Sequence, residues 1–266
     1  MAIKLFVTDL DGTLLDKKHR ISAENKKAIQ EAVAQGTIVT IATGRMYISA
    51  LPYAKQLEVD VPIITYNGAL IKSVSGKVLF ESYLKPQDVK DVLTYCLKKK
   101  WFIQIYKDDK LYFAEHSAKA CAYEDLAGIK GETVGADGLY EKTEHVPKML
   151  VITSGAEETD KVVAELREAF GARVFPVKSN PNYAEIISIG VNKATALEKL
   201  LQKLGLEKEE TMAIGDSNND LPMLKSAGYS VAMGNANDKV KAVCNYETAD
   251  CANDGVAAAI RKYVLK

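Results

Sequence analysis

The stretch IKLFVTDLDGTLLD at residues 3–16 joins an apolar run directly to two aspartates that stand one residue apart. A run as continuously apolar as Ile3–Leu10 is typical of a strand that is covered on both faces. In an extended chain the side chains of Asp9 and Asp11 point to the same side, so both carboxylates can reach one pocket. Taken alone, the pattern also fits a strand that ends in an ordinary polar turn. Features elsewhere in the chain decide between these two interpretations.

The composition narrows the class of protein. The chain has 266 residues, of which 47% are hydrophobic and 26% charged, the balance of a globular protein. Lys plus Arg and Asp plus Glu both number 35, so there is no basic excess to hold a nucleic acid backbone. The four cysteines lack C-x-x-C spacing and are expected to be free thiols. With no signal peptide and no apolar membrane-spanning window, we expect a cytoplasmic protein without nucleic acid or membrane partners.

Both ends of the chain alternate strands with helices. Strands are expected at Ile3–Leu10, Thr37–Thr43, Pro62–Tyr66, Ile186–Ile189, Thr211–Ile214 and Tyr229–Ala232. Short connections between such elements favour right-handed βαβ units and a parallel sheet. The middle instead mixes helices with two hairpins, at 69–80 and 101–114, which indicates an α+β unit. We therefore predict an α/β protein with a Rossmann-like parallel-sheet core, residues 1–82 and 186–266, and an inserted α+β domain, residues 83–185.

Polar residues gather at four places where predicted parallel strands end or a helix begins. These places are Asp9–Asp11, Thr43-Gly44, Asn192-Lys193 and the sequence GDSNND at residues 215–220. Ligands bind at this edge of open α/β sheets. Several carboxylates in one place are tolerable only around a cation, and oxygen ligands favour Mg²⁺.

The residue types at this edge suit phosphoryl transfer. The carboxylate of Asp9 could attack phosphorus, while Asp11 could protonate the leaving oxygen and Gly12 permits the sharp turn. The backbone and hydroxyl at Thr43-Gly44 could hold phosphate or cap a helix. Lys193 opposes the helix dipole, which suggests a nearby anion, although a solvated surface lysine fits as well. The neighbouring Arg45 could also face phosphate, but exposed structural arginines are commoner, so we leave Arg45 out of the site.

Four motifs in this order resemble those of haloacid-dehalogenase-like phosphatases. They are DLDGTLL at 9–15, ATGR at 42–45, GVNKATAL at 190–197 and GDSNNDLPML at 215–224. Their spacing is similar to that of the Cof-type branch, as are Asn67-Gly68-Ala69 and the run AMGNA at 232–236. The chain departs from the family at Ala194, where glycine usually follows the motif lysine. A methyl group inside a helix should leave Lys193 usable.

The resemblance implies a role for each matched residue. By resemblance, Asp9 is the nucleophile and Asp11 the general acid and base. Phosphate contacts are implied for Leu10, Thr43, Gly44, Lys193 and Asn219. The implied Mg²⁺ ligands are Asp9, Asp216 and the backbone carbonyl of Asp11, and Asp220 has a supporting role. The inserted domain would then be a cap that selects the substrate. Near its end, Asn182 and Tyr183 could touch the leaving group or act as a hinge.

The expected activity is Mg²⁺-dependent hydrolysis of small phosphorylated metabolites, such as sugar phosphates or cofactor phosphates, through an aspartyl-phosphate. A phosphomutase or phosphotransferase of the same superfamily would use the same two aspartates and remains an alternative. A phospho-ligand sensor without turnover is a further alternative, although a complete set of Asp11, Lys193 and Asp216 disfavours it. We expect a small phosphorylated metabolite as the partner and a monomer or weak homo-oligomer.

Overall fold

The computed structural model describes residues 2–265, which divide into two compact units, residues 2–80 with 192–265 and residues 81–191. The mixed α/β architecture with an inserted α+β unit confirms the predicted fold class. Across the described residues, no helix combines the length and apolar character needed to cross a membrane. The four cysteines are free thiols, as expected.

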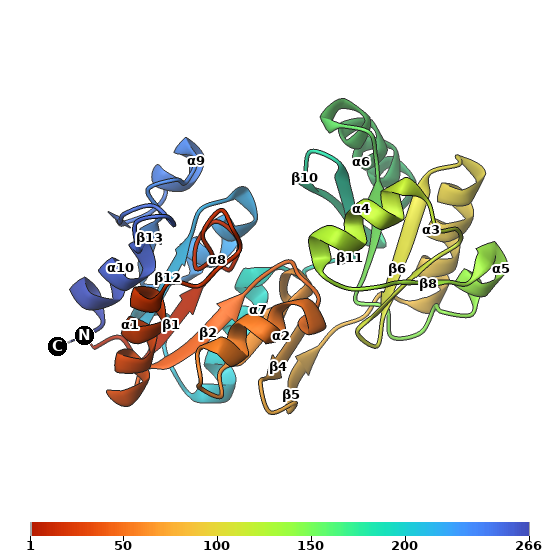
Figure 1. Cartoon of the computed structure of the whole chain (residues 1–266). Coiled ribbons are helices and arrows are strands. Elements are labelled where there is room, and N and C mark those ends of the chain that lie inside the picture. The colour runs from red at the N-terminus through yellow and green to blue at the C-terminus, as the bar shows by residue number, and fades with distance from the viewer. Residues whose placement is uncertain (1, 266) are drawn as a thin grey trace. The chain divides into compact units, whose positions relative to one another are not determined.

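The first unit is built on an eight-stranded sheet within the described residues (Figure 1). Its strands, in spatial order, are β14 (Tyr246–Glu247), β13 (Tyr229–Ala232), β12 (Thr211–Gly215), β1 (Leu5–Thr8), β2 (Ile38–Ala42), β3 (Pro62–Thr65), β4 (Leu70–Ser73) and β5 (Val78–Glu81). The pairs from β14 through β3 are parallel, and β4 returns antiparallel to β3. Every residue of β1 is buried, as the apolar run at the start of the chain predicts.

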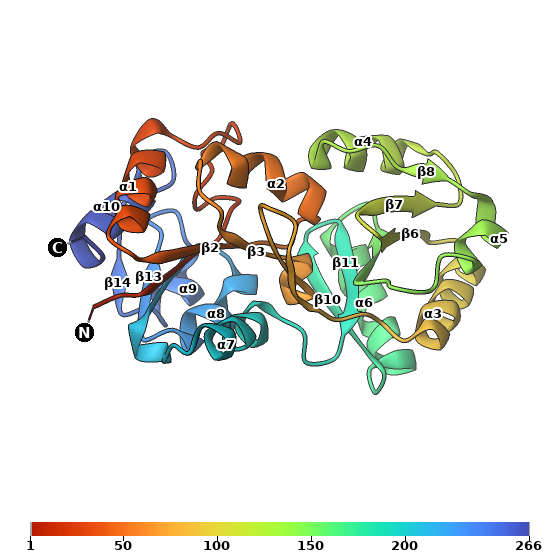
Figure 2. The same ribbon diagram turned by 90° about the horizontal axis from the view of Figure 1, so that it is seen from below.

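Helices cover both faces of this sheet. They are α1 (Ala23–Ala34), α2 (Tyr47–Gln56), α7 (Lys193–Leu204), α8 (Leu221–Ser226), α9 (Asp238–Lys241) and α10 (Gly255–Tyr263). In Figure 2, α1 and α10 lie together on one face, and α7 and α8 lie on the other. Ser22 caps α1 by accepting a hydrogen bond from the Asn25 N–H.

The second unit contains a mixed sheet whose strands run β10 (Val174–Asn180), β11 (Tyr183–Ser188), β9 (Lys148–Ile152), β6 (Phe102–Lys107), β7 (Lys110–Phe113) and β8 (Glu132–Thr133). Its helices are α3 (Pro86–Lys98), α4 (Ala118–Ala127), α5 (Gly135–Tyr140) and α6 (Ala156–Phe170). α3 and α6 bury their apolar sides against one face of this sheet, and α4 lies over the other (Figure 2).

The strand expected at Ile186–Ile189 does not return to the parallel sheet, so that prediction is wrong. β11 pairs antiparallel with both β9 and β10 and therefore belongs to the second unit. A strand with neighbours on both sides and cover on both faces is as apolar as a buried parallel strand, so its sequence does not reveal which sheet it joins. The second unit accordingly extends to Val191, beyond the residue 185 expected from the sequence.

Candidate active site

The candidate site lies in the first unit, where three neighbouring strands end. β1 pairs in parallel with β12 on one side and with β2 on the other. The residues that follow these strands therefore emerge side by side, and they include Asp9, Thr43 and Asp216. The ordering of the parallel strands thus brings together motifs that are far apart in the sequence.

Lys193 is the centre of the cluster. Its ammonium Nζ lies 2.5 Å from Asp9 Oδ1 and 2.6 Å from Asp220 Oδ1, and its side chain is fully buried. The surface-lysine interpretation of Lys193 is therefore wrong, because the structure encloses the ammonium between two carboxylates.

Two local features place Lys193. Asn192 caps α7 by accepting hydrogen bonds from the Ala194 and Thr195 N–H groups, so Lys193 becomes the first residue of the helix. Gly68 lies against the same helix end. A methyl group at Gly68 would lie 2.3 Å from the Asn192 carbonyl oxygen, and the φ of Gly68 is +110°. Only glycine permits both that backbone angle and this close approach.

The Asp216 carboxylate is held from two sides. The Thr13 hydroxyl donates to its Oδ1 at 3.1 Å, and the Ser217 hydroxyl lies 3.3 Å from the same atom. Gly12, at φ +76°, makes room for it, because a methyl group there would come within 2.7 Å of Asp216 Oδ2. The loop that follows β1 therefore supports the residue that follows β12.

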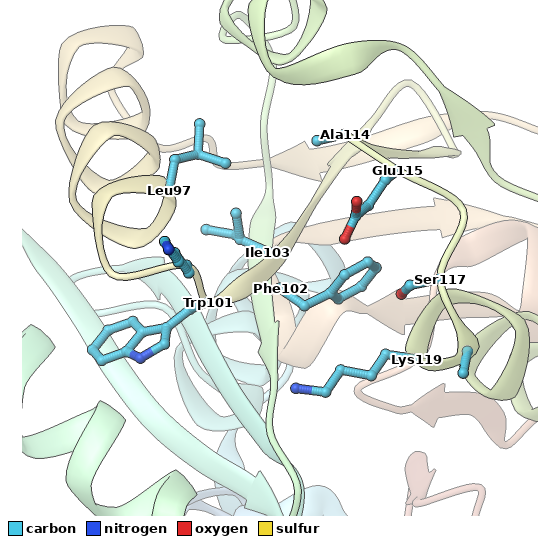
Figure 3. Close-up of a pocket in the computed structure, with 10 residues that line it drawn as sticks. Leu97, Trp101, Phe102, Ile103, Ala114, Glu115, Ser117 and Lys119 are labelled. Carbon is cyan, nitrogen blue, oxygen red and sulfur yellow. The ribbon is translucent and has the colours of Figure 1, made fainter.

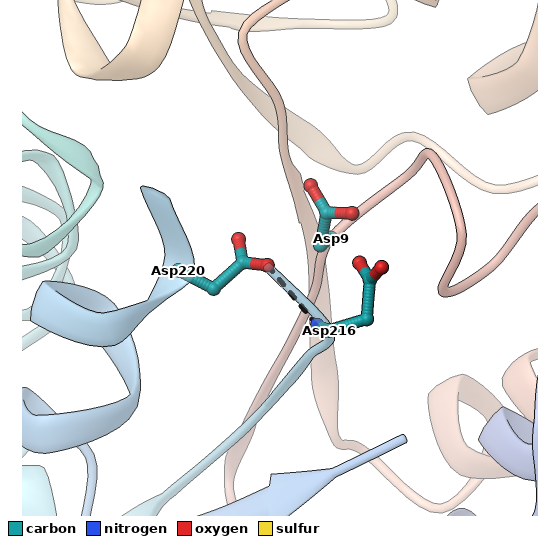
Figure 4. A group of neighbouring side chains, drawn as sticks. All are labelled: Asp9, Asp216 and Asp220. Atoms are coloured by element: carbon teal, nitrogen blue, oxygen red, sulfur yellow. Dashed lines mark hydrogen bonds between the residues drawn. The ribbon is translucent and has the colours of Figure 1, made fainter. Parts of the chain in front are cut away.

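Asp220 supports the site through its whole carboxylate. Its Oδ2 accepts the N–H groups of Asp216 at 3.1 Å and Ser217 at 3.0 Å, while its Oδ1 binds Lys193. Figure 4 shows Asp220 reaching back to the Asp216 backbone, with Asp9 beside them. Gly215 permits this return, since a methyl group there would lie 2.7 Å from Asp220.

Electrostatics favour a bound cation in this cluster. Oxygen atoms of Asp9, Asp216 and Asp220 lie within 4.8 Å of one another, with one ammonium among three carboxylates. Burial, with repulsion from Asp220 and Asp216, holds the pKa of Asp9 well above its usual range despite Lys193. Burial and Asp220 raise the pKa of Asp216 to about 6. The two carboxylates raise the pKa of Lys193, outweighing its burial. This excess of hard oxygen donors fits a divalent metal such as Mg²⁺.

The residues predicted to bind phosphate differ in how far they are buried and in what they contact. Leu10 and Thr43 are buried at the ends of β1 and β2, and the Thr43 hydroxyl accepts the Arg45 N–H at 3.1 Å. Gly44 packs closely against Asn67, whose Oδ1 would lie 3.0 Å from a methyl group at that position. Asn219 is exposed in the turn Asn218–Asp220.

The side chain of Asp11 lies outside the carboxylate cluster. It is bound by Arg45, whose Nε and Nη2 donate to the two Asp11 oxygens at 2.8 and 2.6 Å. Arg45 is not the exposed arginine expected from the sequence, because its side chain is only 16% exposed and its guanidinium binds one of the two predicted catalytic carboxylates. Its position two residues after Thr43, at the same sheet edge, is the sequence signal that could have included it.

Two further hydrogen bonds in the site were not predicted from the sequence. Thr13 binds Asp216, and the Asn235 side-chain amide donates to the Gly12 carbonyl at 2.8 Å. Asn235 lies in the AMGNA run, which the family resemblance singled out without assigning a role. Such supporting contacts join loops more than 200 residues apart in the chain, so local sequence patterns do not predict them.

The second unit has a pocket of its own, of about 480 Å³ (Figure 3). Trp101, Phe102, Glu115 and Lys119 are among its lining residues, and the Lys119 ammonium is already bonded to the Ile152 carbonyl at 2.8 Å. This pocket does not contain the combination of carboxylates and ammonium found in the first unit.

The two residues expected near the leaving group or hinge belong to the second unit. Tyr183 begins β11, and its ring meets Tyr123 edge-on with centroids 5.7 Å apart. The Asn182 carbonyl accepts the Thr153 N–H at 2.9 Å. The structure thus gives both residues local packing and backbone roles within the sheet.

Comparison with known proteins identifies the class. The family model of haloacid dehalogenase-like hydrolases matches residues 6–260, and the chain belongs to this family. It is 35% identical, over 99% of its length and 96% of the relative's, to the Bacillus subtilis 5-amino-6-(5-phospho-D-ribitylamino)uracil phosphatase YcsE. Relatives of this kind are phosphatases, and the chain is a phosphoric monoester hydrolase of the same superfamily.

Solved structures agree with this classification. A haloacid dehalogenase-like hydrolase from Bacteroides thetaiotaomicron superposes with a TM-score of 0.90 at 31% identity, covering 97% of this chain and 98% of that one. A sugar phosphatase of haloacid dehalogenase subclass IIB superposes with a TM-score of 0.83 at 26% identity, covering 99% of this chain and all of its own length. These matches confirm the family membership that the four sequence motifs indicated.

Proposed function

We propose that the protein is a Mg²⁺-dependent phosphatase that hydrolyses small phosphorylated metabolites through an aspartyl-phosphate on Asp9. The observation that carries the proposal is the Lys193 ammonium, buried between Asp9 and Asp220 at 2.5 and 2.6 Å beside the Asp216 carboxylate. An ammonium fixed beside an anionic nucleophile offsets the repulsion between that nucleophile and an anionic phosphate ester.

The reaction takes place in two displacements. One Asp9 carboxylate oxygen attacks phosphorus, and the bond from phosphorus to the leaving oxygen breaks as the Asp11 carboxyl gives that oxygen a proton. Water then attacks the aspartyl-phosphate and gives a proton to Asp11, and inorganic phosphate leaves as the bond to Asp9 breaks. Asp11 thus returns to its starting protonation state.

The remaining residues bind phosphate and metal. The N–H groups of Leu10 and Gly44, the Thr43 hydroxyl and the Asn219 side chain would hold phosphate oxygens. Asp9, Asp216 and the Asp11 backbone carbonyl would hold Mg²⁺, with Asp220 fixing Lys193. When bound, Mg²⁺ supplies further neutralisation of the transferred phosphoryl group.

We propose that the inserted unit acts as a cap that selects the leaving group. The substrates named for the relatives are a phosphorylated ribitylaminouracil and sugar phosphates, and both are polar phosphomonoesters. These two classes support the proposal that this protein acts on a sugar phosphate or a cofactor-related phosphate.

The test measures phosphate release from p-nitrophenyl phosphate with Mg²⁺ and with a chelator, for the wild type and Asp9→Asn. We expect Mg²⁺-dependent release by the wild type and none by the variant. Equal release by both proteins would show that Asp9 is not the nucleophile. A screen of hexose phosphates and phosphorylated ribitylaminouracil, ranked by kcat/KM, then identifies the substrate class. Formation of an isomeric sugar phosphate without free phosphate would indicate a mutase instead.

A further inference from the structure

The Arg45 guanidinium grips the Asp11 carboxylate as a two-pronged fork. Nε donates to Oδ2 at 2.8 Å and Nη2 donates to Oδ1 at 2.6 Å. Two parallel hydrogen bonds of this kind fix the plane of a carboxylate as well as its position. The Asp11 side chain is 43% exposed and that of Arg45 only 16%, so a largely enclosed cation holds a partly open carboxylate. Without the fork, Asp11 would be free to change rotamer.

Arg45 is itself fixed from several sides. Its N–H donates to the Thr43 hydroxyl at 3.1 Å, and its carbonyl accepts the Tyr66 N–H at 2.9 Å. Its guanidinium lies over the Tyr53 ring, 5.1 Å from the ring centre. These contacts tie the fork to the ends of β2 and β3 and to α2. The arrangement therefore presents a preformed geometry to Asp11.

The donors of Arg45 that usually grip a phosphate are already committed. An arginine binds a phosphate in the same two-pronged way in which it binds a carboxylate, and here the Nε and Nη2 edge is occupied by Asp11. His19 lies beside the same pair, with Nδ1 3.3 Å from Arg45 Nη2 and 3.6 Å from Asp11 Oδ1. Arg45 is therefore directed toward the carboxylate and not toward an open anion site.

We infer that Arg45 is a positioning residue for proton transfer: it orients Asp11 toward the leaving-group oxygen and does not bind the phosphate itself. This inference rests on the proposed function, in which Asp11 donates the proton as the ester bond breaks. Misorientation of a catalytic group by about 1 Å can cost on the order of 100-fold in rate. The loss should depend on how much the leaving group needs a proton.

The test compares two aryl esters of similar shape. Phenyl phosphate releases a strongly basic phenolate that benefits from protonation, and p-nitrophenyl phosphate releases a weakly basic one that does not. For Arg45→Gln we expect kcat/KM to fall about 10- to 100-fold for phenyl phosphate and less than about threefold for p-nitrophenyl phosphate, given the size of general acid catalysis. The ratio of the two rates does not depend on how much of the variant is folded, because both rates scale with active enzyme.

A matched control is present in the same region of the chain. Arg20 also pairs with an aspartate through Nε and Nη2, at 3.0 and 2.8 Å, but both hydrogen bonds go to the single oxygen Oδ2 of Asp16, and the Arg20 side chain is 67% exposed. Arg20→Gln should leave the ratio of the two rates unchanged. In an Asp11→Asn background, Arg45→Gln should cause no further selective loss on phenyl phosphate.

The outcomes separate the two proposals. An equal loss on both esters for Arg45→Gln, with weaker inhibition by inorganic phosphate, would mean that Arg45 binds phosphate and would overturn the inference alone. A selective loss that persists in the Asp11→Asn background would also overturn it. If the wild-type enzyme with Mg²⁺ hydrolyses neither ester, the proposed function fails and this inference fails with it.

Discussion

Replacement of Lys193 by methionine tests the charge balance of the site. The substitution keeps most of the side-chain volume and removes the ammonium that lies 2.5 Å from Asp9 and 2.6 Å from Asp220. Both carboxylates are almost completely buried, so water cannot replace the lost partner. Removal of one partner from a buried ion pair costs about 3–5 kcal/mol of unfolding free energy.

A surface pair supplies the control. Lys26 Nζ lies 2.6 Å from Glu58 Oε1, the same separation as that between Lys193 and Asp220, but both side chains are partly or largely exposed. Lys26→Met should cost only about 0–1 kcal/mol, because water solvates the remaining carboxylate. Urea unfolding of the two variants and the wild type at pH 7, in the presence of a chelator, measures both differences.

The pH dependence identifies the cause of the loss. Without Lys193 the buried Asp9 carboxylate loses an attractive charge, so its pKa in the folded state, which burial already raises, rises further. Groups with a raised folded-state pKa destabilise the protein at high pH and cease to do so as they become protonated. The deficit of Lys193→Met should therefore shrink between pH 7 and pH 5. If Lys193→Met loses less than about 1 kcal/mol of unfolding free energy, as Lys26→Met should, the buried ion pair does not stabilise the fold as argued. A large loss that does not change with pH would show that altered packing and not charge is the cause.

Two further predictions concern the helix end and the metal. Gly68→Ala should push the Asn192 carbonyl away and misplace Lys193, lowering kcat/KM about 10-fold or more. Gly76→Ala, also at positive φ but with open space around it, should alter only stability, by about 1–2 kcal/mol; equal kcat/KM for the two variants would contradict this. Burial raises the pKa of Asp216 in the metal-free folded protein from 3.8 to about 6. Between these two pH values the folded state keeps the Asp216 carboxyl protonated while the unfolded state does not, so the free energy of unfolding falls as the pH rises from about 3.8 to about 6. Protons should then compete with Mg²⁺, so the rise in Tm caused by Mg²⁺ should shrink from pH 7 to pH 5 and vanish in Asp216→Asn; a pH-independent rise would contradict the assignment.

Local patterns in the sequence predicted most of the strands of the parallel sheet. The apolar runs at Ile3–Leu10 and Thr211–Ile214 contain the buried strands β1 and β12, and Ser22 is a typical helix cap. Such elements are encoded within a few residues, because burial on both faces or a cap hydrogen bond needs only the neighbouring chain. The helix α10 was not predicted from the sequence. It starts after Asp254, which has a left-handed φ of 56° and makes no side-chain cap bond, so the usual start signal is absent.

Membership in a sheet was harder to predict than the presence of a strand. β11 was recognised as a strand, although its start was placed too late, and it was assigned to the wrong sheet. Its partners β9 and β10 lie before it in the chain and pair with it antiparallel. Strand pairing depends on which surfaces meet in three dimensions, and an apolar run is equally suited to either sheet.

The sequence by itself determined the kinds of chemical group available and the strand or helix ends that carry them, including Asp9, Thr43 and Lys193. Only the tertiary structure decided how these groups pair. Lys193 reaches Asp9 across 184 residues, and Arg45 binds Asp11 across 34. These pairings depend on the order of parallel strands and on the close approach of Gly68 to Asn192. Contacts of this kind arise from packing between distant segments, and local periodicity contains no record of them.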